Sequence, residues 1–542
     1  MSENEQKICK RTPSFRIELS GNDEKKNIIF DKLTKIRNEL TKKSNRPMGN
    51  LQVLEALFEK WFDNEDENPG PAMCPSTYIR TKKTDVNQKI FFIAEDSFRR
   101  CIQVSEWHAR QCSHNLCTNR LIQKGHVVKT NLKCGNQETP HVFSWSSSPY
   151  LQTKEYLINS RVNHGIVCSG ILPSDYKRFV SGSGIGMLNE ERRTSFFNKH
   201  QQHIQEEYNE CVDTALLEEI ASYEDLDSID IMSDARHGWR KNSKDTSVVA
   251  IGEKTHKVLK CEHVTKADDI VSQRHEQVGT VRIYQYMKDK DVRVGVHCHD
   301  RNLSINKYIR EETETLNQND TWHCVKAMKT AMKKIPSGPQ YSKGKTWSFQ
   351  LSDKVEPVAT HVHWCIRNCN QQKEMLKSSL WNIVDHYKNI HTGCSESSRC
   401  RKDTNYEPPR IVISNPVAKK LLVNAILGSN IYKYANDYTL GRDTFYVESF
   451  NNVINIYQNK RISFGDLQYN VRNNLAVCHW NENVDREYTS VSHLNDHRRS
   501  RSKMGKKNYK KATYKFRDKI WSRYINNIYK RKKQNKGKGN NN

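Results

Sequence analysis

Apolar and polar positions in the middle of the chain predict a block of strands interrupted by a helix. The runs 229–234, 246–251 and 258–264 are short, rich in Val and Ile, and separated by polar residues, as consecutive strands would be. A longer segment, 266–287, predicts a helix, and alternation at 292–300 predicts a fourth strand. Because strands and helix are interleaved, the block predicts an α/β fold with a mixed sheet. Further helices are expected at 190–223, 304–312 and 323–335.

Three acidic residues occupy positions in this pattern that favour metal chemistry. Asp234 and Asp300 end two of the predicted strands, and Glu448 lies early in a predicted helix at 444–458. A strand end places a side chain at the rim of a sheet, so a helix that crosses the sheet can bring three carboxylates together. Two Mg²⁺ ions sharing such ligands would activate a water or a 3′-hydroxyl and stabilise the leaving oxygen. The β-β-β-α-β order is that of the RNase H-like fold, so we predict an RNase H-like core with this triad as a two-metal centre.

The predicted core is interrupted, because Asp300 and Glu448 are much farther apart than a strand and a few turns require. We therefore interpret 324–435 as a mainly helical insertion with its own Cys/His cluster. An acidic, proline-marked linker near the amino terminus and a basic shift after residue 480 suggest further boundaries. The predicted organisation is a polar amino-terminal region with one helix (1–87), a zinc-ribbon-like segment (88–148), a helical DNA-binding region (149–223), the core in two parts (224–323 and 436–485) around the insertion, and a basic tail (486–542).

The first group of metal-ligand residue types lies in the ribbon-like segment. It contains Cys101, His108, Cys112, Cys117, Cys134 and His141. We favour Cys112, Cys117, Cys134 and His141 as a Zn²⁺ site, because Cys112-x4-Cys117 with Cys134-x6-His141 resembles zinc knuckles with widened spacing. The alternative is buried thiols in a small β-domain.

The second group lies in the insertion. It combines Cys365-x3-Cys369 with His386, His391, Cys394 and Cys400. We favour Cys369, His386, His391 and Cys394 as the ligands of a second structural Zn²⁺, since tetrahedral Cys/His sites are typical of zinc. The alternative is a core helix with incidental His and surface Cys.

Asp320-x2-His323 lies where the predicted core meets the insertion. Single acids of this kind are more often surface or capping residues, so a cap on the helix at 323–335 is slightly favoured over direct catalysis. Both interpretations stay open on the sequence alone.

The net charge of +26 is concentrated at the carboxyl end, where residues 498–542 hold 18 Lys and Arg and a single acid, Asp518. Such a block favours a polyanion partner. The interleaved aromatic residues can stack on bases or on a protein surface, and we favour nucleic acid. A solvated, disordered tail is the alternative. The aromatic residues are Tyr509, Tyr514, Phe516, Trp521, Tyr524 and Tyr529, and the predicted DNA contacts are Lys460, Arg461, Lys506, Lys507, Lys510 and Lys511.

The compartment expected from the sequence is the nucleus. The run Lys530-Arg531-Lys532-Lys533 is typical of nuclear-import signals, and the polar start of the chain shows no secretory pattern. No apolar stretch approaches membrane-spanning length, so we expect no membrane partner. In that compartment the 16 cysteines are expected as zinc ligands or thiols rather than disulfides.

Sequence blocks around the three acids also carry a family pattern. These blocks are Asp234-Ala235-Arg236, Asp300-Arg301 with Ile309-Arg310-Glu311-Glu312, Asp320-Thr321-Trp322-His323, and Glu448 with Tyr457-x2-Lys460-Arg461. Together with Trp145-Ser146-Ser147-Ser148-Pro149 and the Cys/His groups, they resemble cut-and-paste DNA transposases of the DDE class, most closely the Kolobok-like group. The resemblance covers roughly 90–485, most of the chain.

The resemblance implies Mg²⁺- or Mn²⁺-dependent strand cleavage and transfer, with Asp234, Asp300 and Glu448 as metal ligands. The implied partner is double-stranded DNA, both transposon terminal repeats and target, with no small-molecule substrate. Because two DNA ends must be joined, a homo-oligomer is expected. The alternatives are a catalytically inactive, transposon-derived, zinc-stabilised DNA-binding protein, and a nucleic-acid-binding protein whose three acids are incidental.

Overall fold

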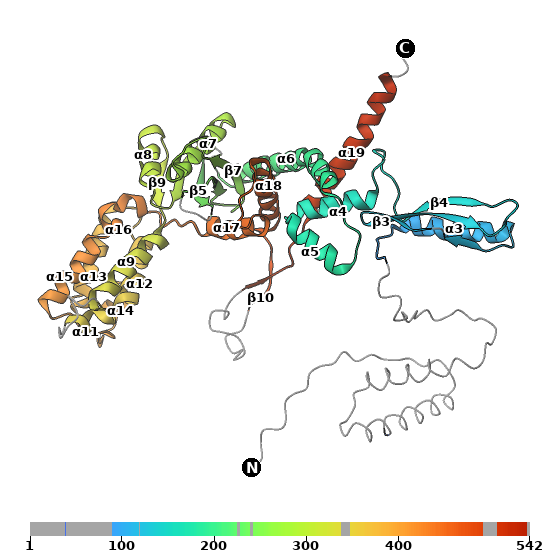
Figure 1. Ribbon diagram of the computed structural model, residues 1–542. Helices are drawn as coiled ribbons and strands as arrows, with labels where there is room; N and C mark the ends of the chain where they lie inside the picture. The colour runs from blue at the N-terminus through green and yellow to red at the C-terminus, as the bar shows by residue number, and fades with distance from the viewer. Residues whose placement is uncertain are drawn as a thin grey trace. The chain divides into compact units, whose positions relative to one another are not determined.

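The computed structural model describes residue 38 and residues 89–118, 120–224, 228–238, 242–337, 347–491 and 507–538 (Figure 1). Residues Lys89–Asn542 form one compact unit, and the fold below is that of this unit. The predicted helix of the amino-terminal region and Lys506 lie outside the described residues.

A five-stranded mixed sheet forms the centre of the unit, in the spatial order β7-β6-β5-β8-β9. β5 pairs antiparallel with β6, and β6 with β7, whereas β5–β8 and β8–β9 are parallel pairs. The mixed sheet predicted from the sequence is therefore present, and its four predicted strands correspond to β5, β6, β7 and β8. The strand bounds are β5 Ser228–His237, β6 Asp245–Gly252, β7 Val258–Thr265, β8 Arg293–His299 and β9 Leu316–Asn319.

The fifth strand, β9, was not predicted, because its sequence Leu-Asn-Gln-Asn has no apolar alternation. Its polar side chains are buried, and each makes hydrogen bonds to residues outside the strand. The amide of Gln318 donates to the carbonyl of Asn436 at 3.0 Å, and its Oε1 accepts from the amide of Leu440 at 3.1 Å. Hydrogen bonds to residues outside the strand, rather than alternating apolar side chains, therefore hold β9 in the protein interior.

Alternating side chains of the strands pack against helices on opposite faces of the sheet. Ile229 and Ile231 of β5 join a core cluster with residues of α7, whereas Met232 joins a cluster with residues of α17 and α18. Because side chains alternate along a strand, α7 and α17 cover opposite faces. Gly279 permits the close approach of α7, since a Cβ there would lie 2.4 Å from Val248. The helix bounds are α7 His275–Asp289, α17 Phe445–Tyr457 and α18 Asp466–Asn483, with η3 Ser272–Arg274 before α7.

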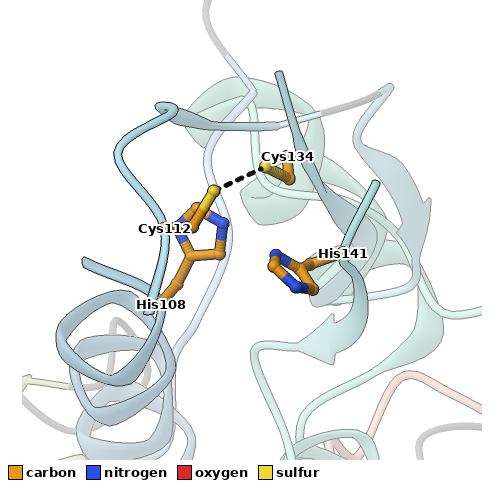
Figure 2. Close-up of side chains that lie close together, drawn as sticks. All are labelled: His108, Cys112, Cys134 and His141. Carbon is orange, nitrogen blue, oxygen red and sulfur yellow. Dashed lines mark hydrogen bonds between the residues drawn. The ribbon is translucent and has the colours of Figure 1, made fainter. Parts of the chain in front are cut away.

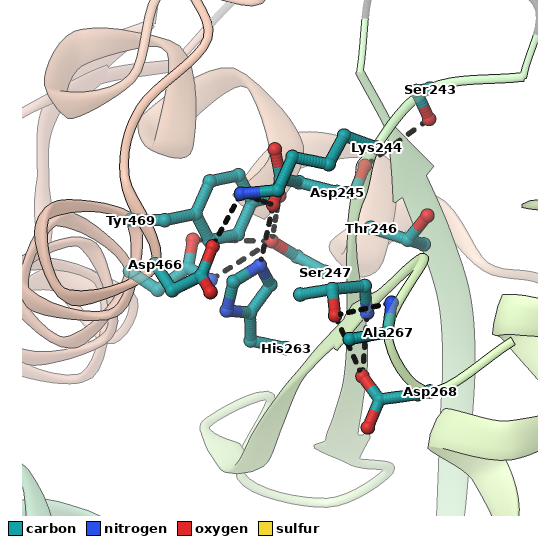
Figure 3. Close-up of polar contacts among 12 residues, drawn as sticks. Ser243, Lys244, Asp245, Thr246, Ser247, His263, Ala267, Asp268, Asp466 and Tyr469 are labelled. Carbon is teal, nitrogen blue, oxygen red and sulfur yellow. Dashed lines mark hydrogen bonds and ion pairs between the residues drawn. The ribbon is translucent and has the colours of Figure 1, made fainter. Parts of the chain in front are cut away.

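Polar contacts fasten α18 to the edge of the sheet (Figure 3). The Nζ of Lys244, just before β6, lies 2.5 Å from the Asp466 carboxylate at the start of α18. Ser247 and Tyr469 join their hydroxyls at 2.8 Å, and His263 lies 3.0 Å from Asp245. The bonds of Lys244 to Asp466 and of Ser247 to Tyr469 each link residues 222 positions apart, so the segment after the insertion returns to the same sheet.

The basic carboxyl-terminal segment folds onto this body through α19 (Lys515–Lys538), which packs on α6 (Glu190–Ala221). Arg523 lies 3.1 Å from Glu207 of α6. Phe516 and Tyr524 are buried, and Trp521 packs beside Tyr524. The prediction that the interleaved aromatics stack on bases is therefore wrong for Phe516 and Tyr524, because an amphipathic helix uses them to pack against the protein. The preceding hairpin pairs β10 (Tyr488–Val491) with β11 (Lys507–Tyr509).

The Cys/His-bearing segment near residue 100 joins a helix to a small antiparallel sheet. In this sheet β3 pairs with β1, β2 and β4, and α3 contacts β4. Two shorter helices follow before α6. The bounds are α3 Glu95–Gln111, β1 Leu116–Thr118, β2 Ile122–Lys124, β3 Val127–Cys134, β4 Val142–Ser146, α4 Leu157–Cys168 and α5 Pro173–Ser183.

The segment between β9 and α17 is helical and has its own apolar core. Val358, Val362, Leu376, Leu380 and Leu422 are fully buried there. No helix of the described ranges combines the length and apolarity that a membrane crossing requires. The bounds are α8 Leu303–Glu312 before β9, then α9 Thr321–Ser337, α11 Trp347–Ser352, α12 Val355–Arg367, α13 Lys373–Tyr387, α14 Arg399–Lys402, α15 Pro416–Leu427, α16 Asn430–Lys433 and η4 Ala435–Tyr438.

Candidate metal centres

Strand register brings Asp234 and Asp300 together. The parallel ladder between β5 and β8 ends with the pair Ser233↔His299, so Asp234 and Asp300 follow it on neighbouring strands. Asp234 does not end its strand as predicted: β5 continues to His237, because its antiparallel ladder with β6 runs on to His237↔Thr246. Asp234 instead lies where the pairing of β5 with β8 ends, so no strand pairs with β5 on that side at Asp234.

Glu448 reaches the same place from the first turn of α17. Asp234 lies two residues after Met232, on the sheet face that α17 covers. Asn451, one turn after Glu448, donates from Nδ2 to the Asp234 carboxylate at 3.0 Å. Beyond the effect of burial, repulsion from Asp300 and Glu448 raises the pKa of Asp234, and repulsion from Glu448 raises the pKa of Asp300. The three carboxylates predicted from the sequence are therefore near one another.

His323 lies among these carboxylates. Its Nδ1 is 3.3 Å from Asp300 Oδ1, and its Nε2 is 3.4 Å from Glu448 Oε1. The sequence analysis noted His323 only as part of Asp320-x2-His323 at a helix start. It did not predict that His323 contacts the carboxylates. The imidazole thus stands between the Asp300 and Glu448 carboxylates.

Asp320 is the cap that the sequence slightly favoured. Its Oδ1 accepts from the backbone amide of His323 at 2.7 Å, which satisfies a free N–H in the first turn of α9. Its Oδ2 accepts from the amide of Thr444 at 2.8 Å and from the Thr444 hydroxyl at 2.6 Å. This buried carboxylate therefore joins the helix that carries His323 to the segment that begins the helix of Glu448.

Arg442 holds the approach to α17 in place. Its guanidinium lies 2.8 Å from the Asp230 carboxylate of β5 and also pairs with Glu253 after β6. Its carbonyl accepts from the amide of Thr321 at 3.1 Å. These contacts join both ends of the long segment between Asp320 and Thr444 to the sheet, so the insertion leaves and re-enters the core at one place.

The electrostatics of the cluster favour a cation. Burial, followed by repulsion from Asp300, raises the pKa of Asp234 to about 6. Burial also raises the pKa of Asp300, and His323 opposes that shift. Oxygen donors are the ligands that Mg²⁺ and Mn²⁺ prefer, and a divalent ion would offset the repulsion that disfavours their charged forms. The donor set therefore fits the predicted Mg²⁺ or Mn²⁺.

A Cys/His group forms between α3 and the small sheet (Figure 2). The ligand atoms of His108, Cys112, Cys134 and His141 lie within 4.8 Å of one another, and the two sulfur atoms are 3.5 Å apart. Two thiolates on one tetrahedral zinc lie about 3.8 Å apart, given Zn–S bonds of about 2.3 Å. Nε2 of His108 and Nδ1 of His141 are buried without a hydrogen-bond partner among the described residues. This arrangement fits a zinc ion.

Cys117, a predicted ligand, does not join this group. His108 takes the ligand position that the sequence analysis assigned to Cys117. In the β1–β3 ladder Leu116 pairs with Cys134, and Cys117 pairs with Lys133. Alternation along the strands therefore turns Cys117 to the face opposite Cys134, and its side chain is exposed. His108 comes instead from the last turn of α3, one turn before Cys112.

The second group forms in the insertion from His386, His391, Cys394 and Cys400. The Cys394 sulfur lies 3.6 Å from Nδ1 of His386 and 3.7 Å from Nδ1 of His391. Cys369, a predicted ligand, is not in the group: its thiol is fully buried and donates to the carbonyl of Ile366 at 3.1 Å. Cys369 follows α12 into the apolar core, whereas Cys394 lies in the loop after α13 and Cys400 lies in the short helix α14.

A third group, absent from the sequence-based predictions, lies beneath α19. His164 and Cys168 share one face of α4 at i and i+4, and His164 Nδ1 lies 2.9 Å from His200 Nε2 of α6. Burial lowers the pKa of His164 to about 4 and raises that of the Cys168 thiol to about 12. Both rings and the thiol are therefore neutral, which suits a hydrogen-bonded core pair.

The predicted DNA-contacting residues fall in two places. Lys460 and Arg461 line a hollow of about 350 Å³ after α17, together with Arg236 and Lys244. Lys507 lies in β11 with its Nζ 4.7 Å from the Tyr488 ring, and Lys510 pairs with Glu487. Lys511 is exposed beyond the hairpin.

Comparison with known proteins gives one family match. The Mutator-like transposase family model matches residues 94–400, more than half of the chain. The matched residues include Asp234, Asp300 and His323, and Glu448 lies beyond them. No curated protein matches the chain. With the mixed sheet and its acidic cluster described, the match shows that the chain belongs to the Mutator-like transposase family.

Proposed function

We propose that this protein is a DNA transposase that cleaves and joins strands at transposon ends by a two-metal mechanism with Asp234, Asp300 and Glu448. The single observation that supports this most strongly is the gathering of the three carboxylates around His323, from two strands and a helix. The sheet order β7-β6-β5-β8-β9 supports assignment of the core to the RNase H-like fold. Within the transposases, the Kolobok-like group remains our finer prediction.

When bound, Mg²⁺ or Mn²⁺ would supply Lewis-acid activation of the attacking oxygen and stabilisation of the leaving oxygen. Asp234 and Asp300 would hold the ions from adjacent strands, and Glu448 would close the site from α17. Asn451 fixes the orientation of the Asp234 carboxylate through its 3.0 Å hydrogen bond. His323 keeps Asp300 and Glu448 apart by standing between them, and Asp320 fixes the helix that carries His323.

The remaining features are assigned to DNA handling and support. We propose the groups His108/Cys112/Cys134/His141 and His386/His391/Cys394/Cys400 as structural Zn²⁺ sites. The DNA partner is both terminal repeats and target, in a homo-oligomer within the nucleus. Lys460 and Arg461, which line a hollow after α17, would neutralise backbone phosphates of the bound DNA.

A nicking assay tests the proposal. The full chain is incubated with labelled terminal-repeat DNA and Mg²⁺, beside Asp234→Asn and a surface control, Asp289→Asn. We expect metal-dependent nicking by wild type and control, and retained DNA binding without nicking by Asp234→Asn. Nicking that survives Asp234→Asn would refute the assignment of the triad. DNA binding without nicking by the wild type would instead favour a non-enzymatic DNA-binding protein.

A further inference from the structure

Helix α9 carries positive charge away from the carboxylate centre. It begins beside that centre, because His323 in its first turn lies 3.3 Å from Asp300 and 3.4 Å from Glu448. Its buried side then packs into the apolar core of the insertion. The sequence of the helix, residues 321–337, contains four lysines and no acidic residue. The helix therefore joins the proposed cleavage site to the insertion and carries only positive formal charge along its length.

One exposed side of α9 is hollowed. A depression of about 650 Å³ extends along it from His323 to Lys334, and Ala327, Thr330 and Ala331 line it between these two ends. These residues are spaced three or four positions apart, so they share one side of the helix. Because the side chains between the two ends are small, an extended ligand can approach the helix backbone closely there.

The lysines of this depression have no acidic partners. Lys326 and Lys334 line it, are exposed, and form no ion pair with any residue that the structure describes. The Nζ of Lys326 lies 4.3 Å from the centroid of the exposed Trp322 ring. Lys329, which does not line the depression, instead pairs with Glu356 at 2.5 Å. The charges available to a ligand are therefore those on the hollowed side, and they favour an anionic ligand.

The length of this side suits a DNA backbone. Lys334 follows His323 by about three helical turns, which is about 16 Å along the helix axis. One strand of duplex DNA has a phosphate about every 3.4 Å along its axis, so about five phosphates fit within that length. In the proposed reaction the cleaved phosphodiester lies at the carboxylate centre, which is the His323 end. The phosphates that adjoin the cleaved bond can then lie along α9.

We propose that the hollowed side of α9 binds the backbone of the DNA next to the cleaved bond and directs that DNA toward the insertion. Lys326 and Lys334 neutralise its phosphates, and the small side chains between them allow the strand to lie close to the helix. The inference rests on the proposed function, since it names the path of the DNA at that same centre. This surface is separate from Lys460 and Arg461, which line the hollow after α17.

The test compares Lys326→Gln/Lys334→Gln with Lys419→Gln/Lys420→Gln, which removes two exposed lysine charges from α15 of the same insertion. The full chain binds a labelled terminal-repeat duplex that continues beyond the cleaved bond, without Mg²⁺ so that no strand is cut. Affinity is measured at about 0.05 M and about 0.2 M salt. Two lost phosphate contacts lower the salt dependence, so the wild type and the control should lose about tenfold more affinity over this range than Lys326→Gln/Lys334→Gln.

An unchanged salt dependence in Lys326→Gln/Lys334→Gln overturns the inference. An equal decrease in the control also overturns it, because net charge alone would then account for the effect. If light scattering shows a changed oligomeric mass while the salt dependence is unchanged, the surface binds a second copy of the chain instead of DNA. Should the double variant fail to fold, Lys334→Gln alone should reduce the loss of affinity about threefold, and no reduction there overturns the inference.

Failure of the proposed function is separable from failure of this inference. Binding is measured without Mg²⁺ and does not depend on cleavage. A wild type that shows the expected salt dependence but never nicks refutes the transposase activity and leaves α9 as a DNA-binding surface. Nicking that requires Asp234, together with unchanged salt dependence in the α9 variant, leaves the transposase activity in place and refutes the path along α9.

Discussion

The carboxylate centre and the two Cys/His groups are held together by different parts of the molecule. Asp234 and Asp300 lie on adjacent paired strands, and Glu448 lies on a helix fastened by Asp320 and Arg442. The Cys/His groups instead draw on a helix end, a loop and short strands. The sheet thus fixes its ligands before any metal binds, whereas the Cys/His ligands lie on segments that a metal would itself hold together.

The two kinds of site also differ in electrostatic state. The carboxylates repel one another, and burial raises the pKa of Asp234 to about 6. In the insertion group, burial lowers the pKa of both His386 and His391, which favours their neutral imidazoles. A preformed but repulsive site favours exchangeable ions and chemistry, while a closed Cys/His site favours structural support. The predictions below test this contrast.

The largest effect is expected at Glu448. Glu448→Gln removes one charge from the carboxylate centre without changing its shape, so nicking should fall on the order of a thousandfold or more. Asp443→Asn, five residues earlier and outside the cluster, is the matched control and should nick at near the wild-type rate. Rates on labelled repeat DNA give the comparison, and equal loss in both variants would show that the α17 start, not the carboxylate, matters.

A large effect on metal content is expected in the ribbon-like segment. Cys134→Ser should lower bound zinc by about one ion per chain and destabilise the segment, because Cys134 belongs to the group in Figure 2. Cys117→Ser should keep its full zinc content, since that thiol faces away from the group. Elemental analysis of the purified variants decides between them; zinc loss in Cys117→Ser would restore the spacing-based ligand set.

The Cys/His group of the insertion can be tested in the same way, and here the two variants should differ in both zinc content and stability. Cys400→Ser should lose about one zinc per chain. Cys369→Ser should keep it but lose about 1–3 kcal/mol of stability, because a hydroxyl replaces a thiol in an apolar core. Zinc analysis beside thermal melting separates the two effects. Zinc loss in Cys369→Ser with retention in Cys400→Ser would reverse the assignment made here.

The smallest effect is a pH dependence of the metal-free protein. Since folding raises the pKa of Asp234 from 3.8 to about 6, the folded state binds its proton more tightly. That contribution to stability is complete below pH 4 and is lost as pH rises through about 6. Asp234→Asn should therefore match the wild type near pH 4 and melt a few degrees higher near pH 7 without metal. Melting curves that differ equally at both pH values would contradict this.

Much of the sheet could be predicted from the sequence, because strands buried on both faces are short runs rich in Val and Ile. In β6, which is buried throughout, Val248 and Val249 pack into the clusters on opposite faces. The strand β9 could not be predicted, because its buried Gln318 bonds to Asn436 and Leu440, more than 100 residues away. The segment of α19 was predicted to be part of a basic tail for a related reason. Its positive charge is evident in the sequence, but its packing against α6 is not.

The sequence by itself determined which acids lie together, because strand pairing and helix placement follow from local patterns that also fix Asp234, Asp300 and Glu448. Only the tertiary structure decided which Cys and His side chains meet, since strand alternation turns Cys117 away and core packing draws Cys369 inward. Spacing constrains ligands within one element, whereas the contacts between elements depend on which faces the whole chain buries.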